Sequence, residues 1–187
     1  MRPSFEYVIK YDKPKIIAEI GVASGDNALD MIMNYPIDYM LLVDNYLPYT
    51  DIANNNIVSL EQQNDNLFIM LKKFLPRQYM NKIVFSYISS KEVVKYIPDN
   101  FFDYIYIDGS HEYNDAKQDM ELWFPKVKNN GYISGHDFNG YYESVTIAVN
   151  EFISKNSENG TFINVNNDND DVRYRSHDWL FKKCIKY

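Results

Sequence analysis

Acids and histidines stand directly after two apolar runs of strand length. In one run, Tyr-Ile-Tyr-Ile is followed by Asp108 and then by His111, and in the other, Tyr-Ile-Ser-Gly is followed by His136 and Asp137. Groups placed just beyond the last rung of a buried strand can face a crevice without being buried unpaired. Because open α/β sheets bind their ligands at the carboxyl ends of the strands, these four residues are the first candidates for a functional site.

Three of these side chains could converge on one divalent cation, namely Asp108, His136 and Asp137. Carboxylate oxygens suit Mg²⁺ or Ca²⁺, and an imidazole shifts the preference toward Mn²⁺, Fe²⁺ or Zn²⁺. The alternative is that His136 and Asp137 only hydrogen-bond neighbouring loops. His111 is a candidate general base, because an imidazole with a pKa near 6.5 can accept a hydroxyl proton at neutral pH. The alternative for His111 is stacking near a cofactor.

A glycine-rich turn follows the first apolar run of the chain. Gly21 and Gly25 permit a positive φ and a close approach of the backbone to a ligand. A dinucleotide fingerprint would need glycine at two further positions, which hold Ala23 and Asp26. Glu19 adds a negative charge beside the turn. The turn therefore favours a cationic or neutral ligand over a pyrophosphate.

A second run ends in Asp44, about 20 residues beyond the glycine turn. An acid at this strand end is placed to accept hydrogen bonds from both hydroxyls of an adenosine ribose. Asp44 is thus the leading candidate for a ligand contact. The alternative is an acid that caps a turn at the strand end.

The elements that would position these residues alternate between strand and helix, which predicts an α/β, doubly wound sheet. Strands are expected at residues 16–22, 39–45, 82–88, 102–108 and 131–136. Helices are expected at residues 26–34, 57–75, 90–96, 114–127 and 141–155. The polar stretch 156–171 should be mostly loop around a short strand at 162–165, and a last strand at 177–185 should add an antiparallel pair at the sheet edge.

Taken together, these motifs resemble the class I S-adenosylmethionine-dependent methyltransferases. The resemblance rests on Glu-Ile-Gly-Val-Ala-Ser-Gly at 19–25, on Asp44, on Asp-Gly-Ser-His at 108–111 and on Gly-His-Asp at 135–137, and it covers roughly residues 14 to 155. It is strongest to small-molecule O-methyltransferases that carry D-G-x-H and H-D motifs. The resemblance implies a Rossmann-like three-layer sandwich, with a mostly parallel seven-stranded sheet and an antiparallel C-terminal strand.

The resemblance also implies roles for particular residues. It places Asp44 at the ribose, and Asn45 and Ser89 beside the adenine. Asp108 would contact the cofactor and bind the metal, and Asp108 and His111 would be the catalytic residues. The methionine end would be lined by Glu19, Gly21, Ala23, Ser24 and Gly25. Relatives often carry Gly-Asp-Ser where this chain has Ile88-Ser-Ser, so backbone groups would have to replace the usual acidic contact to the adenine amine. Related sugar-directed enzymes hold a metal with three carboxylates. This chain has two carboxylates, Asp108 and Asp137, and has His136 in place of the third.

Composition bounds the remaining possibilities. The 187 residues fit one domain over residues 1–187, and a net charge of -7 with a pI near 4.9 argues against a nucleic-acid partner. No apolar run approaches the roughly 20 residues that cross a bilayer, so no membrane partner is expected. The N-terminus also lacks the long apolar stretch of a signal peptide, so a cytoplasmic protein is expected. The single cysteine, Cys184, cannot form an intramolecular disulfide, which agrees with a reducing compartment. Cys184 and His177 are expected to be packing residues.

The activity implied by the resemblance is methyl transfer from S-adenosylmethionine to a hydroxyl of a small molecule. A sugar or glycan is a candidate acceptor, and Mg²⁺ or Mn²⁺ is a candidate second cofactor. A nicotinamide-dependent oxidoreductase and a cofactor-binding protein without transferase activity stay open as alternatives, as does a homo-oligomeric state. The segments that would cover the acceptor, residues 1–13, 46–56 and 138–142, carry no readable ligand code, although their tyrosines suit a glycan or an aromatic acceptor.

Overall fold

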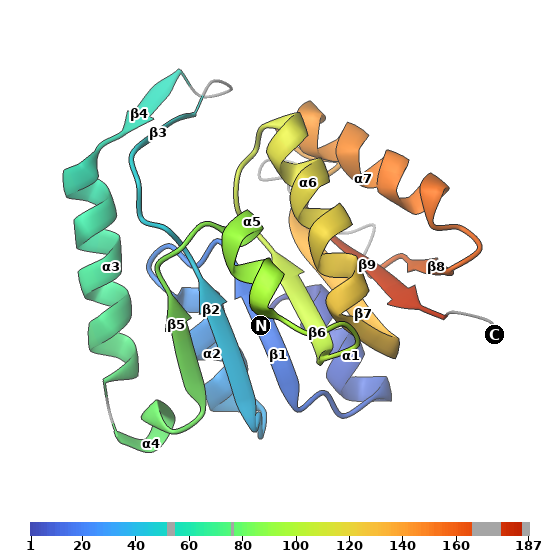
Figure 1. Ribbon diagram of the computed structural model, residues 1–187, viewed down its shortest axis with the longest axis horizontal. Coiled ribbons are helices and arrows are strands. Elements are labelled where there is room, and N and C mark those ends of the chain that lie inside the picture. Colours follow the sequence, from blue (N-terminus) through green and yellow to red (C-terminus); the bar gives the residue numbers. More distant parts are fainter. Residues whose placement is uncertain (52–54, 76, 166–176, 185–187) are drawn as a thin grey trace.

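The computed structural model describes residues 1–51, 55–75, 77–165 and 177–184, and Figure 1 shows a twisted sheet between two layers of helices. The sheet has seven strands in the order β5-β2-β1-β6-β7-β9-β8. Strands β5, β2, β1, β6 and β7 are parallel, and β9 pairs antiparallel with both β7 and β8. The strands are β1 (Ile16–Ile20), β2 (Tyr39–Val43), β5 (Ile83–Ser86), β6 (Phe102–Ile107), β7 (Val127–Phe138), β8 (Gly160–Ile163) and β9 (His177–Lys183). The α/β class and the antiparallel last strand are confirmed.

Two apolar cores lie on opposite faces of the sheet, because successive strand residues point to opposite sides. One core joins the sheet to α1 (Pro3–Tyr11), α2 (Asp26–Asn34) and α3 (Leu60–Phe74). The other joins it to α6 (Tyr113–Trp123) and α7 (Glu143–Lys155). Strands covered on both faces read as nearly continuous apolar runs, as β6 does.

The shorter elements are α4 (Arg77–Met80), α5 (Ser90–Val93), two 3₁₀ turns (Val94–Tyr96 and Phe124–Lys126) and a separate hairpin of β3 (Tyr49–Asp51) and β4 (Asn56–Val58). The hairpin projects beyond α3 at the same end of the sheet as the strands' carboxyl ends (Figure 1). Within the described residues, no helix is long and apolar enough to cross a membrane.

Several expected boundaries are wrong, each for a local reason. The helix expected from residue 57 begins at Leu60, because residues 56–58 form β4 and Ser59 makes a capping box with Gln62. The helix expected to reach residue 127 ends at Trp123 and continues as a 3₁₀ turn through Pro125. The short strand expected at 162–165 lies at Gly160–Ile163, where it pairs with β9.

Two elements were not predicted at all, the N-terminal helix α1 and the β3–β4 hairpin. The strand expected at 131–136 is longer, and β7 runs from Val127 to Phe138 because its first residue pairs with Phe102. The later part of the loop expected over 156–171, and residue 185 of the last strand, lie outside the described residues. His177 and Cys184 are half-buried, and the thiol is free.

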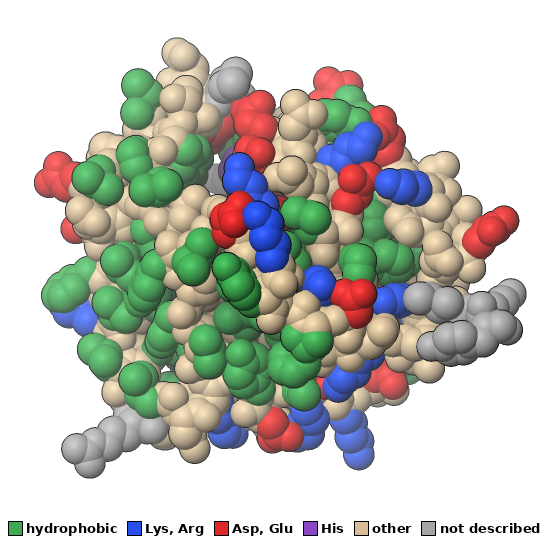
Figure 2. Space-filling model, in the orientation of Figure 1, with side chains coloured by type: hydrophobic (Ala, Val, Ile, Leu, Met, Phe, Trp, Pro, Cys, Tyr) green, Lys and Arg blue, Asp and Glu red, His purple; other side chains and the backbone are tan. Residues whose placement is uncertain are grey.

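Hydrophobic side chains also reach the surface around α3 and the β5 edge of the sheet (Figure 2). Phe68 and Ile69 on α3, Val84 on β5, and Ile88 are each more than 40% exposed, at 58%, 43%, 45% and 52%. Single exposed apolar residues are common on protein surfaces, whereas several along one edge form a patch of the kind that binds another protein. The homo-oligomeric state stays a prediction, and this edge is the surface that would form the contact.

Candidate active site at the carboxyl ends of the strands

The glycine turn brings the end of β1 against the end of β6. Gly21 has φ 84°, and a Cβ there would lie 2.1 Å from the carbonyl oxygen of Asp108. Only glycine permits this approach together with this conformation. Gly25 is left-handed as well, with φ 74°, and Ala23 holds φ 45° although it is not a glycine. The turn therefore presents its backbone at the point where the strand order reverses between β1 and β6, which is where such sheets bind ligands.

Asp44 organises this turn from the end of β2. One carboxylate oxygen accepts the backbone N–H groups of Val22 and Ala23, each at 2.9 Å, and the other accepts the N–H of Tyr46 at 2.9 Å. A carboxylate has about four acceptor positions, so capacity for a ligand hydroxyl remains. The turn-capping alternative is thus present in the structure. The ribose contact stays a prediction.

The other residues expected around the cofactor lie near the same turn or on the adjacent loop. Ser24 donates to Asp26 at 2.6 Å, and the side chain of Asn45 accepts the N–H of Leu47 at 3.1 Å. Ser89 is the residue before α5. The next residue, Ser90, donates to the buried carboxyl of Asp119, an acid that sequence reasoning did not single out. Burial raises the pKa of Asp119 to about 6.

Glu19 is buried in the sheet, with 2% of its surface exposed. One carboxyl oxygen accepts from Asn27 Nδ2 at 3.1 Å, and the other, Oε2, is buried with no hydrogen-bond partner. Burial raises the pKa of Glu19 to about 8, and the nearby charge of Asp108 acts in the same direction. The group is therefore mostly protonated at neutral pH.

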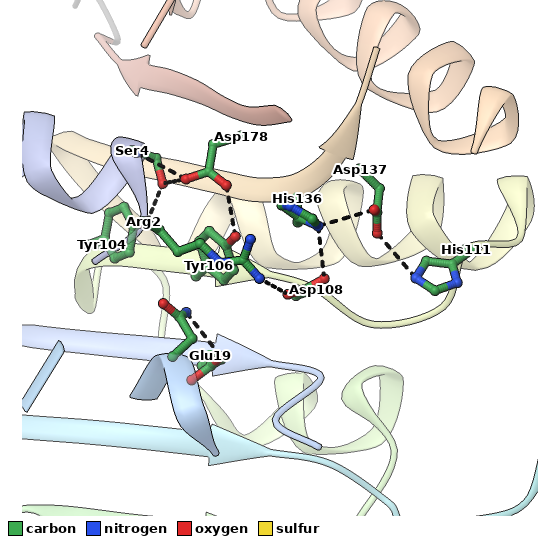
Figure 3. A network of polar contacts seen from close by, with 11 residues as sticks. Arg2, Ser4, Glu19, Tyr104, Tyr106, Asp108, His111, His136, Asp137 and Asp178 are labelled. Carbon is green, nitrogen blue, oxygen red and sulfur yellow. Dashed lines mark hydrogen bonds and ion pairs between the residues drawn. The ribbon is translucent and has the colours of Figure 1, made fainter. Parts of the chain in front are cut away.

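The four residues singled out first form one chain of contacts (Figure 3). His136 Nδ1 lies 3.1 Å from Asp137 Oδ1 and 3.9 Å from Asp108 Oδ1. The other oxygen of Asp137 lies 3.1 Å from His111 Nε2. Asp137 has φ 62°, a strained conformation that carries its carboxylate between the two imidazoles. The structure thus brings Asp108, His136 and Asp137 together at the strand ends, and the roles expected for them stay predictions.

Burial and charge shift the protonation of this cluster. Burial raises the pKa of Asp108, against the opposing charges of His136 and Arg2. For His111, burial alone would lower the pKa, but the hydrogen bond that its Nε2–H donates to Asp137 and the charges of Asp137, Asp51 and Asp108 outweigh burial and raise the pKa above 6.5. The imidazole is therefore a stronger base than it would be in water.

The donor set of Asp108, His136 and Asp137 fits a divalent cation. One ligand atom from each lies within 4.8 Å of the others, which is close to the spacing between ligands around one small ion. One histidine with two carboxylates suits Mn²⁺ or Fe²⁺ better than Ca²⁺. Arg2 already contacts Asp108, at 3.2 Å, so an ion would share that carboxylate with a guanidinium or displace it.

Three residues that sequence reasoning did not assign border the cluster: Tyr142, Asp51 and Arg2. The ring of Tyr142 stacks on His111, with centroids 3.7 Å apart and planes at 17°. Its hydroxyl donates to Asp51 at 3.2 Å, which links the start of α7 to the β3–β4 hairpin. All three residues, Tyr142, Asp51 and Arg2, lie in segments that were expected to cover the acceptor. Arg2 and Asp51 gave no signal of a role, because a lone charged residue in a segment without a motif is usually a solvated one.

A hollow lies directly beside the cluster on the α6–α7 side of the sheet. Its polar lining comes from Ser110 and the four residues of the contact chain, and its apolar lining includes Met120, Val145, Val149 and Trp179. A doubly wound sheet with a glycine turn, an acid after β2 and a polar chain after β6 and β7 defines an α/β protein that binds a cofactor at the strand ends.

Comparison with known proteins agrees with this class. A model of the family described as "Methyltransferase domain" matches residues 18–138. That is more than half of the chain, so the chain belongs to this methyltransferase family. No curated protein sequence matches the chain. Because the chain belongs to a methyltransferase family, the alternative of a nicotinamide-dependent oxidoreductase is set aside.

Solved structures share the fold across almost the whole chain. A protein from Streptococcus mutans, provisionally named a methyltransferase and solved with S-adenosylhomocysteine, has a TM-score of 0.70 at 9% identity, covering 98% of this chain and 99% of its own. A provisionally named rRNA methylase from Clostridium thermocellum has a TM-score of 0.69 at 12% identity over 96% and 95%. The O-methyltransferase NovP has a TM-score of 0.64 at 17% identity over 97% and 77%. At these identities the likeness shows the fold.

Proposed function

We propose that this methyltransferase transfers the methyl group to a hydroxyl of a small molecule, with His111 as the base. The observation that carries the proposal is the contact from His111 through Asp137 to His136, placed beside the glycine turn. An oxygen nucleophile needs a group that removes its proton, and an imidazole with a carboxylate behind it is suited to that task.

The cofactor would lie across the ends of β1 and β2. Asp44 would hold the ribose hydroxyls, Glu19 and the turn from Gly21 to Gly25 would line the methionine end, and Asn45 and Ser89 would flank the adenine. Since Asp44 also fixes the turn through three backbone N–H groups, the same carboxylate would order the pocket and bind the ligand. Holding the nucleophile, the methyl group and the sulfur in line is the main contribution of such a pocket.

Proton removal would take place at His111. Its Nε2 faces Asp137, so Nδ1 is the atom left to accept the acceptor's proton. Asp137 stabilises the resulting imidazolium, which is consistent with the raised pKa of His111. A divalent cation held by Asp108, His136 and Asp137 would supply polarisation of a hydroxyl or a diol when bound.

The acceptor that best suits the surroundings is a polyol such as a sugar. Tyr142 offers an aromatic ring, and Asp51 and Asp137 offer carboxylates that can accept hydrogen bonds from hydroxyls. A large RNA acceptor is disfavoured, because a net charge of -7 opposes a phosphate backbone.

The test is a screen of purified protein with labelled S-adenosylmethionine against sugars, phenols and amines, with and without added Mn²⁺. Methylation of hydroxyl compounds that is lost in His111→Ala would support the proposal. Methylation of amines alone, or unchanged turnover in His111→Ala, would reject it.

A further inference from the structure

Arg2 reaches into the candidate site from a part of the chain that the family model does not cover. Its guanidinium lies 3.2 Å from Asp108 Oδ2 and 5.8 Å from the centre of the Tyr106 ring (Figure 3). The family match begins at residue 18. Arg2 is thus a feature of this chain's own N-terminal segment, placed at the carboxyl end of β6.

The position of Arg2 is fixed by a buried anchor two residues further on. Ser4 donates to Asp178 through its backbone N–H at 3.0 Å and its hydroxyl at 2.6 Å, and Tyr106 donates to the other oxygen of Asp178 at 3.0 Å. Ser4 is fully buried and Asp178 is 2% exposed. A carboxylate at the N-terminus of a helix is favourably placed, because the first N–H groups there have no partner within the helix. The backbone that carries Arg2 is therefore held rigidly against the sheet.

Two carboxyl groups on neighbouring strands act on Arg2, one by direct contact and one through its charge. Asp108 follows β6, and Glu19 lies on β1 opposite Tyr106 of β6, on the face that α1 covers. Both influence the guanidinium electrostatically, as does Asp178. Glu19 is fully buried, and its Oε2 has no hydrogen-bond partner. An unpartnered buried carboxyl oxygen is costly in a site that holds no ligand, which indicates that a ligand group is meant to meet it.

The hydrogen-bonding capacity of Arg2 is also largely unused. An arginine has five N–H donors, and among the described residues its side chain makes one hydrogen bond, to Asp108. A planar guanidinium is matched in shape to a carboxylate, which it can bind through two parallel hydrogen bonds. The site thus combines one underused carboxylate receptor with two carboxyl groups that suit an ammonium.

We propose that Arg2 binds the α-carboxylate of the cofactor's methionine end, while Glu19 and Asp108 face its α-ammonium group. An α-amino acid group carries one charge of each sign on adjacent atoms, and the site offers the complementary pair. The inference rests on the proposed cofactor position at the glycine turn. It adds a binding residue that lies outside the shared methyltransferase core.

The test compares two ligands that differ in the amino acid group alone. S-Adenosylhomocysteine carries the α-amino acid, and 5′-methylthioadenosine lacks it. Affinities for both are measured by calorimetry on the full chain with a C-terminal tag, so that Met1 and Arg2 keep their neighbours. The variants are Arg2→Met, which keeps the length of the side chain, and Lys10→Met, a matched control at the exposed far end of α1.

We expect Arg2→Met to weaken S-adenosylhomocysteine by roughly 10- to 100-fold, the range of a hydrogen bond to a charged group, and to leave 5′-methylthioadenosine unchanged. Lys10→Met should change neither. Unchanged binding of S-adenosylhomocysteine in Arg2→Met would overturn the inference, and so would an equal loss for both ligands, because Arg2 would then only support the fold of the pocket. If the unmodified chain binds neither ligand, the proposed cofactor position itself fails.

A second variant guards against a folding defect. Arg2→Lys keeps the charge but loses the planar fork, so it should bind S-adenosylhomocysteine with an intermediate affinity while its melting temperature stays that of the unmodified chain. A melting temperature that falls while both variants bind the two ligands in the original ratio would assign Arg2 a structural role and reject the proposal.

Discussion

Glu19 should make the stability of the ligand-free protein fall as the pH rises. Burial raises the pKa of this carboxyl from 4.5 to about 8 in the folded chain. Between these two values the folded state binds a proton that the unfolded state has released, so the free energy of unfolding decreases with rising pH. Above a pH of about 8 the loss is complete.

The magnitude follows from the shift. Each unit of pKa difference corresponds to about 1.4 kcal/mol, so the full displacement of Glu19 amounts to roughly 4–5 kcal/mol between pH 4 and pH 9. The group is fully buried, and no discount for exposure to solvent applies. Glu19→Gln has nearly the same shape as the protonated acid and cannot ionise. It should match the unmodified protein at pH 5 and exceed its stability by several kcal/mol at pH 9.

The assay is urea unfolding of the ligand-free protein at pH 5, 7 and 9, for the unmodified chain, Glu19→Gln and the exposed control Glu158→Gln. Other groups titrate over the same range, so the informative quantity is the difference between each variant and the unmodified chain. A difference for Glu19→Gln that stays constant from pH 5 to pH 9 would refute the reasoning. A trend of equal size in Glu158→Gln would do the same.

Three further outcomes are expected. Asp44→Ala should weaken the binding of S-adenosylhomocysteine by at least 10-fold in calorimetry, because a charged acceptor for the ribose hydroxyls is lost. Asp44→Asn should weaken this binding less. A folded Asp44→Ala variant with unchanged affinity would exclude the ribose contact. The rate of methyl transfer should rise with pH through an apparent pKa above 6.5, because His111 must be deprotonated to act as the base and its pKa is raised. His111→Ala should flatten this limb of the rate profile without loss of cofactor affinity. Removal of divalent cations by a chelator should abolish turnover. Added Mn²⁺ should restore turnover in the unmodified chain but not in Asp137→Ala. Full activity after chelation would leave the cluster of Asp108, His136 and Asp137 as an acid–base site alone.

The sheet was predictable because its strands are buried on both faces. In the central strands apolar runs stop abruptly at polar residues, so both the strand and its functional end are visible in the sequence. The convergence of Asp108, His136 and Asp137 followed from the parallel pairing of β6 and β7 alone. The antiparallel last strand was implied by the family resemblance and by the apolar run from residue 177.

What could not be predicted depends on contacts between distant residues. Nothing near Arg2 marks it as a site residue, because its partner Asp108 lies 106 positions away. Asp44 pairs with the backbone of the glycine turn, and no side-chain pattern reveals that hydrogen bond. The β3–β4 hairpin was missed because its strands are short and mostly exposed, with no alternation of apolar and polar residues.

The bond between Ser4 and Asp178 joins the first helix to the last strand, over a separation of 174 residues. A ribosome that adds about 5–20 residues per second completes this separation roughly 10–35 s after the first helix is made. During that interval the N-terminus of α1 has no buried carboxylate to accept its hydrogen bonds, and Arg2 can be held only by its contacts with Tyr106 and Asp108. The pocket is thus complete only once β9 has been made, and a chain cut short before β9 would lack the buried carboxylate that anchors the backbone next to Arg2.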